Sequence, residues 1–176
     1  MSLRRQLTLS LVIILVLFAV NVGTHFWGSY ARNESMLAYR NSVSAGQLST
    51  EVGQLLEDQR QQILILAALR DTTEERLGDA ELQRAEDALI LINQKIETLG
   101  TLSRGVTELN YELLWQSSST LLTRWLKFYR SYNDPTFEMD MNDPLPFLQA
   151  SQRLTELERR QEFIAAQRSD IIDRTI

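Results

Sequence analysis

LTLSLVIILVLFAVNVGTHFW, residues Leu7–Trp27, is long and apolar enough to cross a membrane as one helix. Its centre, Leu11–Val20, contains no charged residue and no proline. A helix of about 20 mostly apolar residues spans the hydrocarbon layer, and inside lipid it satisfies its own backbone hydrogen bonds. We therefore predict a transmembrane helix over residues 7–27.

The charges beside this stretch predict its orientation. Arg4 and Arg5 precede it, and no comparable basic cluster follows closely. The positive-inside rule then keeps residues 1–6 as a cytoplasmic head and places residues 28–176 on the outer side, in contact with membrane lipid only near the span. The predicted membrane-interface residues are Arg4, Arg5, His25, Trp27 and Tyr30.

A cleaved secretory signal is the alternative interpretation of the same stretch. Its apolar core is usually about 7–15 residues long and ends in a small-x-small cleavage site. Ala19-Val20-Asn21 and Val22-Gly23-Thr24 match that pattern poorly, and the apolar run continues past them. We therefore favour an uncleaved anchor.

Composition excludes several classes of function. The chain has 176 residues, a net charge of -5, no cysteine and a single histidine. An acidic chain is repelled by phosphates, so we expect no nucleic-acid partner. Thiolate and histidine-cluster metal sites are excluded by the residue counts, and we expect no metal and no cofactor. Three prolines and seven glycines suit long helices.

Apolar residues in the outer part recur at steps of three and four, the period of packed helices. The predicted helices cover about residues 31–70, 73–99, 107–132 and 144–176. The predicted seam of the first is Leu48, Val52, Leu55, Gln59, Ile63, Leu66 and Arg70. The second ends at Gly100, and its start remains open between a Thr72–Glu75 capping box and Gly78-Asp79. Asp143-Pro144 supplies an oxygen cap and a proline for the fourth start.

Four consecutive helices with short connections predict an all-α fold, an up-down-up-down antiparallel four-helix bundle continuing from the membrane helix. The first and fourth helices are the longest, so we expect them to extend as a two-helix stalk toward the membrane. We also expect the chain to continue beyond Ile176 into a second membrane helix. The fourth helix carries polar residues on its seam, which we interpret as a signalling seam: Gln161, Arg168 and Thr175.

The basic head Met1–Arg5, the span and the long first and fourth helices resemble bacterial transmembrane receptors with a four-helix-bundle sensor domain. Chemoreceptors, sensor histidine kinases and receptor-type nucleotide cyclases share this layout. The resemblance implies an inner-membrane protein with a periplasmic sensor domain. It also implies a homodimer that passes a shift induced by a small-molecule ligand or a periplasmic protein through the membrane.

Two sets of residues are candidates for binding a ligand. Aromatic residues of the third helix recur at helical spacing, and they predict either a pocket or, more simply, filled core. Arginines on the first and third helices could bind a carboxylate, or they could be paired locally. The candidates are Arg60, Arg70, Trp115, Trp125, Tyr129 and Arg130, with Arg124 as a further arginine. Asp140, Asn142 and Asp143 lack the glycine and the glutamate of a calcium loop, so helix capping explains Asp143 better.

No catalytic constellation is present: there is no cysteine nucleophile and no glycine-rich phosphate loop. We predict no enzymatic activity in this segment; a kinase or cyclase module would lie downstream. Two functions remain, the sensory input domain of a receptor and a membrane-anchored helical scaffold without ligand sensing.

Overall fold

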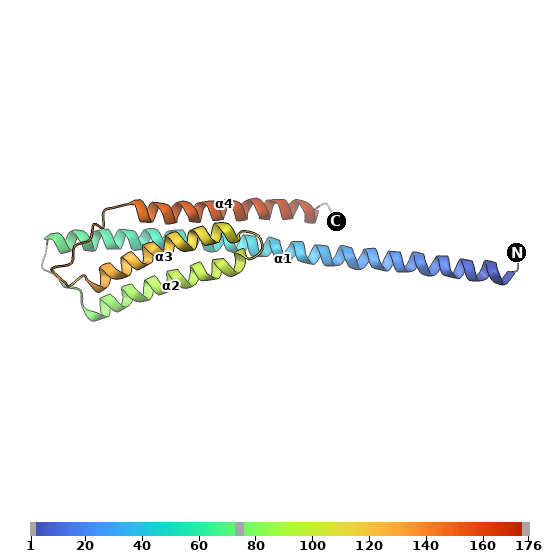
Figure 1. Cartoon of the computed structure of the whole chain (residues 1–176), viewed down its shortest axis with the longest axis horizontal. Helices are drawn as coiled ribbons and strands as arrows, with labels where there is room; N and C mark the ends of the chain where they lie inside the picture. Colours follow the sequence, from blue (N-terminus) through green and yellow to red (C-terminus); the bar gives the residue numbers. More distant parts are fainter. Residues whose placement is uncertain (1–2, 73–75, 174–176) are drawn as a thin grey trace.

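One continuous helix, α1 (Leu3–Thr72), joins the apolar span to the rest of the molecule. The computed structural model describes residues 3–72 and 76–173, and leaves out the side chains of residues 3–10 and 31. Nothing in α1 interrupts the helix between Trp27 and the bundle, because that stretch holds no proline. The first third of α1 extends alone, away from the other helices (Figure 1).

Three further helices complete the described part of the chain: α2 (Asp79–Ser103), α3 (Glu108–Arg130) and α4 (Leu145–Asp173). Each runs antiparallel to the one before it, and the contacts link α1 with α2 and α4, and α3 with α2 and α4. No strand occurs among these residues. The prediction of an all-α, up-down-up-down four-helix bundle is therefore confirmed.

The core lies along the inward faces of all four helices. On α1 the buried residues Ser49, Val52, Leu56, Gln59 and Ile63 alternate by three and four. Leu48, Leu55 and Leu66 of the predicted seam pack against the edge of the core and are only partly buried, so the seam differs from the prediction at Ser49 and Leu56, which take the buried positions. The small, polar Ser49 occupies the inward position there, and an apolar pattern does not select a serine.

Helix α2 begins and ends later than predicted. It starts at Asp79, where the Glu81 carboxylate accepts a hydrogen bond of 3.0 Å from the Gly78 backbone N–H, so the second proposed start is confirmed. Thr72 belongs to α1, and the rest of the Thr72–Glu75 capping box lies outside the described residues.

Gly100 does not end α2, which continues to Ser103. A Cβ atom at Gly100 would lie 2.7 Å from Oη and 2.8 Å from Cε1 of Tyr111. The glycine therefore lets the Tyr111 ring lie against the backbone of α2. Gly105, with φ of 75°, adopts the left-handed conformation in the α2–α3 turn.

The connection between α3 and α4 is held at both ends. Helix α3 ends at Arg130, before the predicted residue 132, and the Tyr132 hydroxyl then donates to the Leu66 carbonyl of α1 at 3.2 Å. Asp143 Oδ1 accepts a hydrogen bond of 3.1 Å from the Leu145 N–H. This confirms that Asp143 caps α4. The predicted last residues of that helix, 174–176, lie outside the described part.

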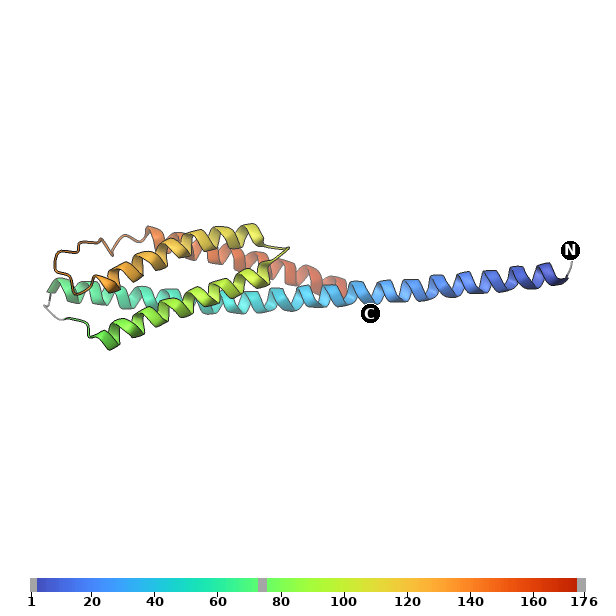
Figure 2. The same ribbon diagram turned by 60° about the horizontal axis from the view of Figure 1, so that its bottom comes forward.

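Helix α4 runs past the α2–α3 turn and continues beside α1, as both views of the ribbon show (Figure 2). We call this two-helix portion, α1 residues 32–45 with α4 residues 162–173, the stalk. The bundle therefore narrows from four helices to two on the side that faces the apolar span.

Candidate functional site

Small polar side chains gather where the bundle narrows to the stalk. Gln161 of α4 is 1% exposed, and its amide donates 2.7 Å to the Thr107 hydroxyl and 3.4 Å to that of Ser103. Both hydroxyls are buried at the α2–α3 turn. Burying the Gln161 amide without hydrogen-bond partners would cost free energy. These hydrogen bonds therefore favour one position of α4 along the bundle axis relative to that turn.

The face of α1 that is buried along the stalk is made of small residues. Ser35, Ser42 and Ser49 are buried at intervals of seven residues, and Ala45 between them is fully enclosed. Farther along the same helix, Leu56 and Ile63 occupy equivalent positions. The interlocking side chains of α1 therefore become smaller toward the membrane-facing end, and dispersion contacts decrease with them.

Ser49 departs from the usual rule that enclosed polar groups are paired. Its hydroxyl oxygen is the one fully enclosed side-chain polar atom without a hydrogen-bond partner among the described residues. Close by on α1, Thr50 donates 2.7 Å to Glu158 of α4, and a Cβ atom at Gly53 would lie 3.4 Å from a methyl group of Leu154. The helices approach closely here, but the enclosed hydroxyl adds no bond across the interface.

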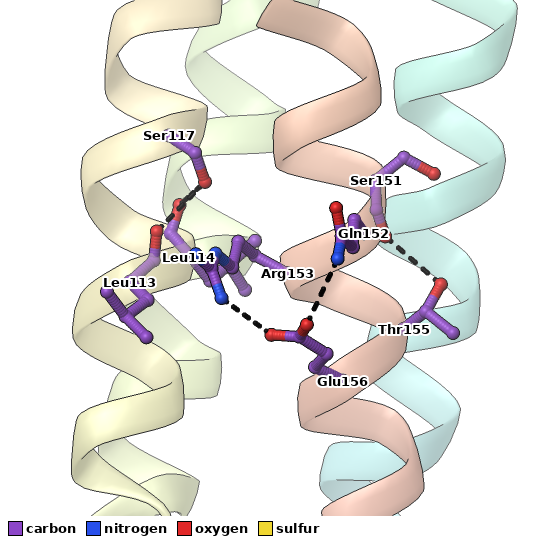
Figure 3. Close-up of polar contacts among 8 residues, drawn as sticks. All are labelled: Leu113, Leu114, Ser117, Ser151, Gln152, Arg153, Thr155 and Glu156. Carbon is purple, nitrogen blue, oxygen red and sulfur yellow. Dashed lines mark hydrogen bonds and ion pairs between the residues drawn. The ribbon is translucent and has the colours of Figure 1, made fainter.

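Three polar side chains in the middle of α4, those of Gln152, Arg153 and Thr155, bond within their own helix. Figure 3 shows Arg153 and Gln152 both reaching the Glu156 carboxylate, at 2.9 and 3.3 Å. On α3, Ser117 donates 2.9 Å to the Leu113 carbonyl of its own helix. None of the bonds drawn among these eight residues joins α3 to α4.

Arg70 secures the connection between α3 and α4 at the far end of the bundle. Its guanidinium donates 2.8 Å to the Asp134 carbonyl and a short hydrogen bond to the Phe137 carbonyl, and it lies 5.6 Å from the centre of the Phe137 ring. A surface depression of about 810 Å³ lies beside these residues and Arg76. Hydrogen bonds from Thr136 lower the pKa of the Asp134 carboxyl.

The other candidate arginines also have partners within the chain. Arg130 pairs with Glu86 of α2 at 2.8 Å, and Arg60 pairs with Glu57 at 3.3 Å. The Arg60 guanidinium lowers the pKa of the Glu57 carboxyl and lies 4.7 Å from the centre of the Phe147 ring. The structure therefore distributes Arg60, Arg70 and Arg130 over separate places instead of one anion site.

The aromatic candidates of α3 mainly fill the core. Tyr129 is 1% exposed and accepts a short hydrogen bond from the Gln59 amide of α1. Burial raises the pKa of Tyr129 to about 12. Trp125 is buried, whereas Trp115 is partly buried and tilted against Tyr111, with ring centres 6.4 Å apart. The core interpretation therefore explains Tyr129 and Trp115.

Trp125 also borders a small cavity between α1, α3 and the start of α4. We call it the Trp125 cavity; its volume is about 140 Å³, and its charged lining residues are Arg60, Arg124 and Asp143. Arg124 pairs with Asp143 at 3.2 Å and donates a short hydrogen bond to the Asp140 carbonyl. Sequence reasoning named Arg60 and Trp125 but gave no sign that they meet, because α1 and α3 are distant in the chain.

The other predicted residues concern the seam of α4 and the interface with the membrane. Arg168 on the seam of α4 is half-buried, and Thr175 lies outside the described residues. Trp27 and Tyr30 are 79% and 73% exposed, and His25 is exposed beside them. Arg4 and Arg5 belong to α1, but their side chains are not described. In the part of the chain that the structure describes, one helix is apolar and long enough to cross a membrane, and no residue of its apolar stretch is buried.

Comparison of the chain with protein-family models, with curated proteins and with solved structures finds no match. Within residues 3–72 and 76–173, no three His, Cys, Asp or Glu side chains gather as metal ligands do. The structure thus defines an all-α bundle on one long apolar helix, whose candidate sites are the polar layer at Gln161 and the Trp125 cavity.

Proposed function

We propose that this chain is the sensory input domain of a bacterial membrane receptor. In this proposal residues 7–27 anchor it in the inner membrane, residues 1–6 are cytoplasmic and the bundle is periplasmic. A ligand or a periplasmic partner displaces α4 relative to α1, and the displacement passes toward the membrane. The domain itself catalyses no reaction.

The continuity of α1 is the observation that carries the proposal. Its 70 residues run as one helix from the apolar span to the far end of the bundle. A continuous helix transmits an axial shift or a rotation along its length, since its backbone hydrogen bonds resist local bending. Displacements of about 1–2 Å between packed helices are sufficient for switching in known proteins.

The interface between α1 and α4 suits a limited displacement. Ser42, Ala45 and Ser49 present few large side chains to α4, and Ser49 adds no hydrogen bond. Moving α4 along this face therefore separates fewer interlocked atoms than moving it along Leu56 or Ile63. Two sets of hydrogen bonds oppose the movement and so define one resting position: those of Gln161 to Thr107 and Ser103, and the bond of 2.7 Å from Thr50 of α1 to Glu158 of α4.

The stalk also supports association of two copies. It consists of only two helices, and it exposes Leu37 at 61% and Phe163 at 58%. A second copy placed beside the first would make a four-helix stalk and cover these side chains, which two helices alone leave in water. We therefore include a homodimer in the proposal.

Orientation and dimerisation are tested with single cysteines, because the chain contains none. In spheroplasts, a membrane-impermeant maleimide is expected to label Gln94→Cys, on the exposed side of α2, and to spare Gln6→Cys until the membrane is permeabilised. Under mild oxidation, Leu37→Cys is expected to form a dimer in membranes. Leu109 on α3 is 74% exposed but lies outside the stalk, and the control variant Leu109→Cys is expected to remain monomeric.

Transmission is tested in a chimera that joins residues 1–176 to the second membrane span and kinase module of another bundle-type receptor. A disulfide between Gly53→Cys and Leu154→Cys would fix α4 on α1. We expect oxidation to change kinase output and reductant to restore it. The control pair Glu86→Cys and Arg130→Cys replaces two residues that meet only at the tips of their side chains, so it is bridged with a reducible bis-methanethiosulfonate; this link joins α2 to α3 and is expected to leave output unchanged. Equal output from both pairs in both states contradicts the proposal.

The alternative, a membrane-anchored helical scaffold, is favoured by one observation. Arg60, Arg70, Arg124 and Arg130 each bond to a carboxylate or a carbonyl of the chain itself, as arginines that only hold the bundle together would. A scaffold would give the predicted labelling of Gln94→Cys, but its chimera would not respond to the α1–α4 disulfide. The chimera therefore distinguishes the two functions.

A further inference from the structure

The Trp125 cavity has the size of a small organic molecule. Its volume of about 140 Å³ is close to that of an engineered cavity of about 150 Å³ that binds benzene. Its walls come from three places in the chain: Ile63 on α1, Leu121 on α3, and Pro144 and Phe147 at the start of α4. These walls suit a compact apolar group of about six carbon atoms.

Trp125 lines this cavity, and its indole N–H has no hydrogen-bond acceptor among the described residues. Trp125 is 3% exposed. Ser49 Oγ is the only fully enclosed side-chain polar atom without a partner in the described part of the chain, so the Trp125 N–H is not fully enclosed and a small molecule can reach it. A buried tryptophan N–H usually has a partner, and a ligand in the cavity would provide one.

The charged groups at the cavity favour an acceptor with negative charge. Arg60 and Arg124 both line it, whereas Asp143 is the one carboxylate that does so among the described residues. That carboxylate is already occupied, because it accepts from Arg124 at 3.2 Å and from the Leu145 N–H at 3.1 Å. Each guanidinium has five N–H donors, and the hydrogen bonds of Arg60 and Arg124 among the described residues use only two nitrogens of each. Donors are therefore in excess.

We propose that the Trp125 cavity binds a small carboxylate with a flat apolar body, of about the size of benzoate. The apolar part packs against Ile63, Leu121 and Phe147, and the carboxylate accepts hydrogen bonds from the Trp125 indole and the Arg124 guanidinium. A planar carboxylate matches the guanidinium fork. Inorganic phosphate leaves the apolar walls in contact with water, and a cationic analogue meets two like charges.

This site also touches both helices that the proposed function makes responsible for transmission. Arg60 belongs to α1, and Asp143 caps the first turn of α4 while bonding to Arg124. A carboxylate at Arg124 brings a second negative charge beside Asp143 and so acts on the start of α4. That the carboxylate is a stimulus rests on the proposed function, whereas its binding does not.

Binding is tested on the complete 176-residue chain in lipid nanodiscs by calorimetry, with benzoate, neutral benzamide, cationic benzamidine and inorganic phosphate as probes. We expect saturable binding of benzoate and at least about 10-fold weaker binding of the other three, the loss that accompanies one charge-assisted hydrogen bond. In micelles of the ¹⁵N-labelled chain, benzoate is expected to shift the Trp125 indole proton signal, which Trp125→Phe identifies by removing it.

Two variants and two matched controls locate the site. Arg124→Gln is expected to weaken benzoate binding by about 10-fold or more, and Trp125→Phe by about 5-fold. Arg130→Gln and Trp115→Phe make the same chemical changes outside the cavity and are expected to bind as the unmodified chain does. Circular dichroism establishes that each variant is folded.

Asp143→Asn keeps an oxygen for the cap and frees Arg124, so it is expected to bind benzoate at least as tightly as the unmodified chain. This variant keeps the test decisive if Arg124→Gln fails to fold. Absence of saturable benzoate binding, equal binding of benzamide, or equal weakening by Arg124→Gln and Arg130→Gln overturns the proposal. Failure of the chimera to respond to its disulfide affects only the proposed function.

Discussion

The amide of Gln161 on α4 donates a hydrogen bond of 2.7 Å to the hydroxyl of Thr107, at the turn between α2 and α3. The contact therefore holds α4 against the turn at which the chain reverses direction between α2 and α3. Both residues are buried, and Ser103 adds a second acceptor for the same amide. A polar contact among the apolar residues of a helix seam favours one axial position, so this contact favours one position of α4 along the bundle over positions shifted by a turn.

Replacing Gln161 with leucine is therefore expected to lower the free energy of unfolding by about 1–3 kcal/mol, because two buried hydroxyls lose their donor. Urea unfolding of the chain in detergent, followed by circular dichroism, measures the change. Gln167→Leu, on an exposed position of the same helix, is the matched control and is expected to change stability by less than about 0.5 kcal/mol. Equal losses in both variants would show that the buried contact is not stabilising.

Tyr129 predicts a loss of stability at high pH. Its folded pKa is raised from 10.0 to about 12 by burial, so the neutral phenol stabilises the fold fully below pH 10. As the pH rises from 10 to 12, the unfolded chain ionises first and this contribution is lost. Unfolding measured at pH 8, 10 and 11 is expected to show a smaller decline for Tyr129→Phe than for the unmodified chain.

In Tyr129→Phe, the loss of stability at high pH is expected to be smaller than in the unmodified chain but still present. Burial and the nearby Glu97 and Glu112 also raise the pKa of Tyr111. At neutral pH, Tyr129→Phe is expected to cost about 1 kcal/mol, because the buried Gln59 amide loses its phenol acceptor. A pH dependence identical to that of the unmodified chain would contradict the assignment to Tyr129.

Gly100→Ala tests the close approach of α2 and Tyr111. The new methyl group would overlap the Tyr111 ring, so we expect a loss of about 1–3 kcal/mol in unfolding free energy. In a Tyr111→Ala background the same change is expected to cost nothing. Gly46→Ala, a helical position with nothing within 4 Å, is the control and is expected to stabilise the chain by about 0.5–1 kcal/mol.

Gly100 also illustrates which parts of the fold the sequence could predict. Helical periodicity and the shortage of prolines were enough for four helices and their alternating directions. A glycine near the end of a periodic run indicates a helix end, but here it provides space for Tyr111, a residue of the next helix. Local patterns carry no information about such a contact, which forms only when α2 and α3 pack together.

Local sequence patterns were also insufficient for the buried face of α1 and for the Trp125 cavity. An apolar pattern selects Leu48 and passes over Ser49, although Ser35, Ser42 and Ser49 share one heptad position with the buried Leu56 and Ile63. That interval of seven was the signal that could have found the correct seam. Arg60 and Trp125 were selected for their chemistry, but their common cavity requires the contact between α1 and α3 and the course of the loop before α4.

The position of Arg70 in the sequence allowed two roles, that of a ligand for an anion and that of a group paired within the chain. Its guanidinium donates to the carbonyls of Asp134 and Phe137 through one nitrogen, Nη2, and lies 5.6 Å from the centre of the Phe137 ring, which indicates a structural role in the α3–α4 connection. Arg70→Met removes these bonds, and Arg70→Lys replaces the planar guanidinium beside the Phe137 ring with a compact ammonium group on a shorter side chain.

In both variants we expect residues 131–144 to open more often, so limited proteolysis there should accelerate by about 5–10-fold, the effect of losing about 1–1.5 kcal/mol of local stability. The control Arg84→Met removes an exposed charge from α2 and is expected to be cleaved at the original rate. Unchanged cleavage of Arg70→Met would show that the loop is held by other contacts, and would make the Arg70 guanidinium available for an anion after all.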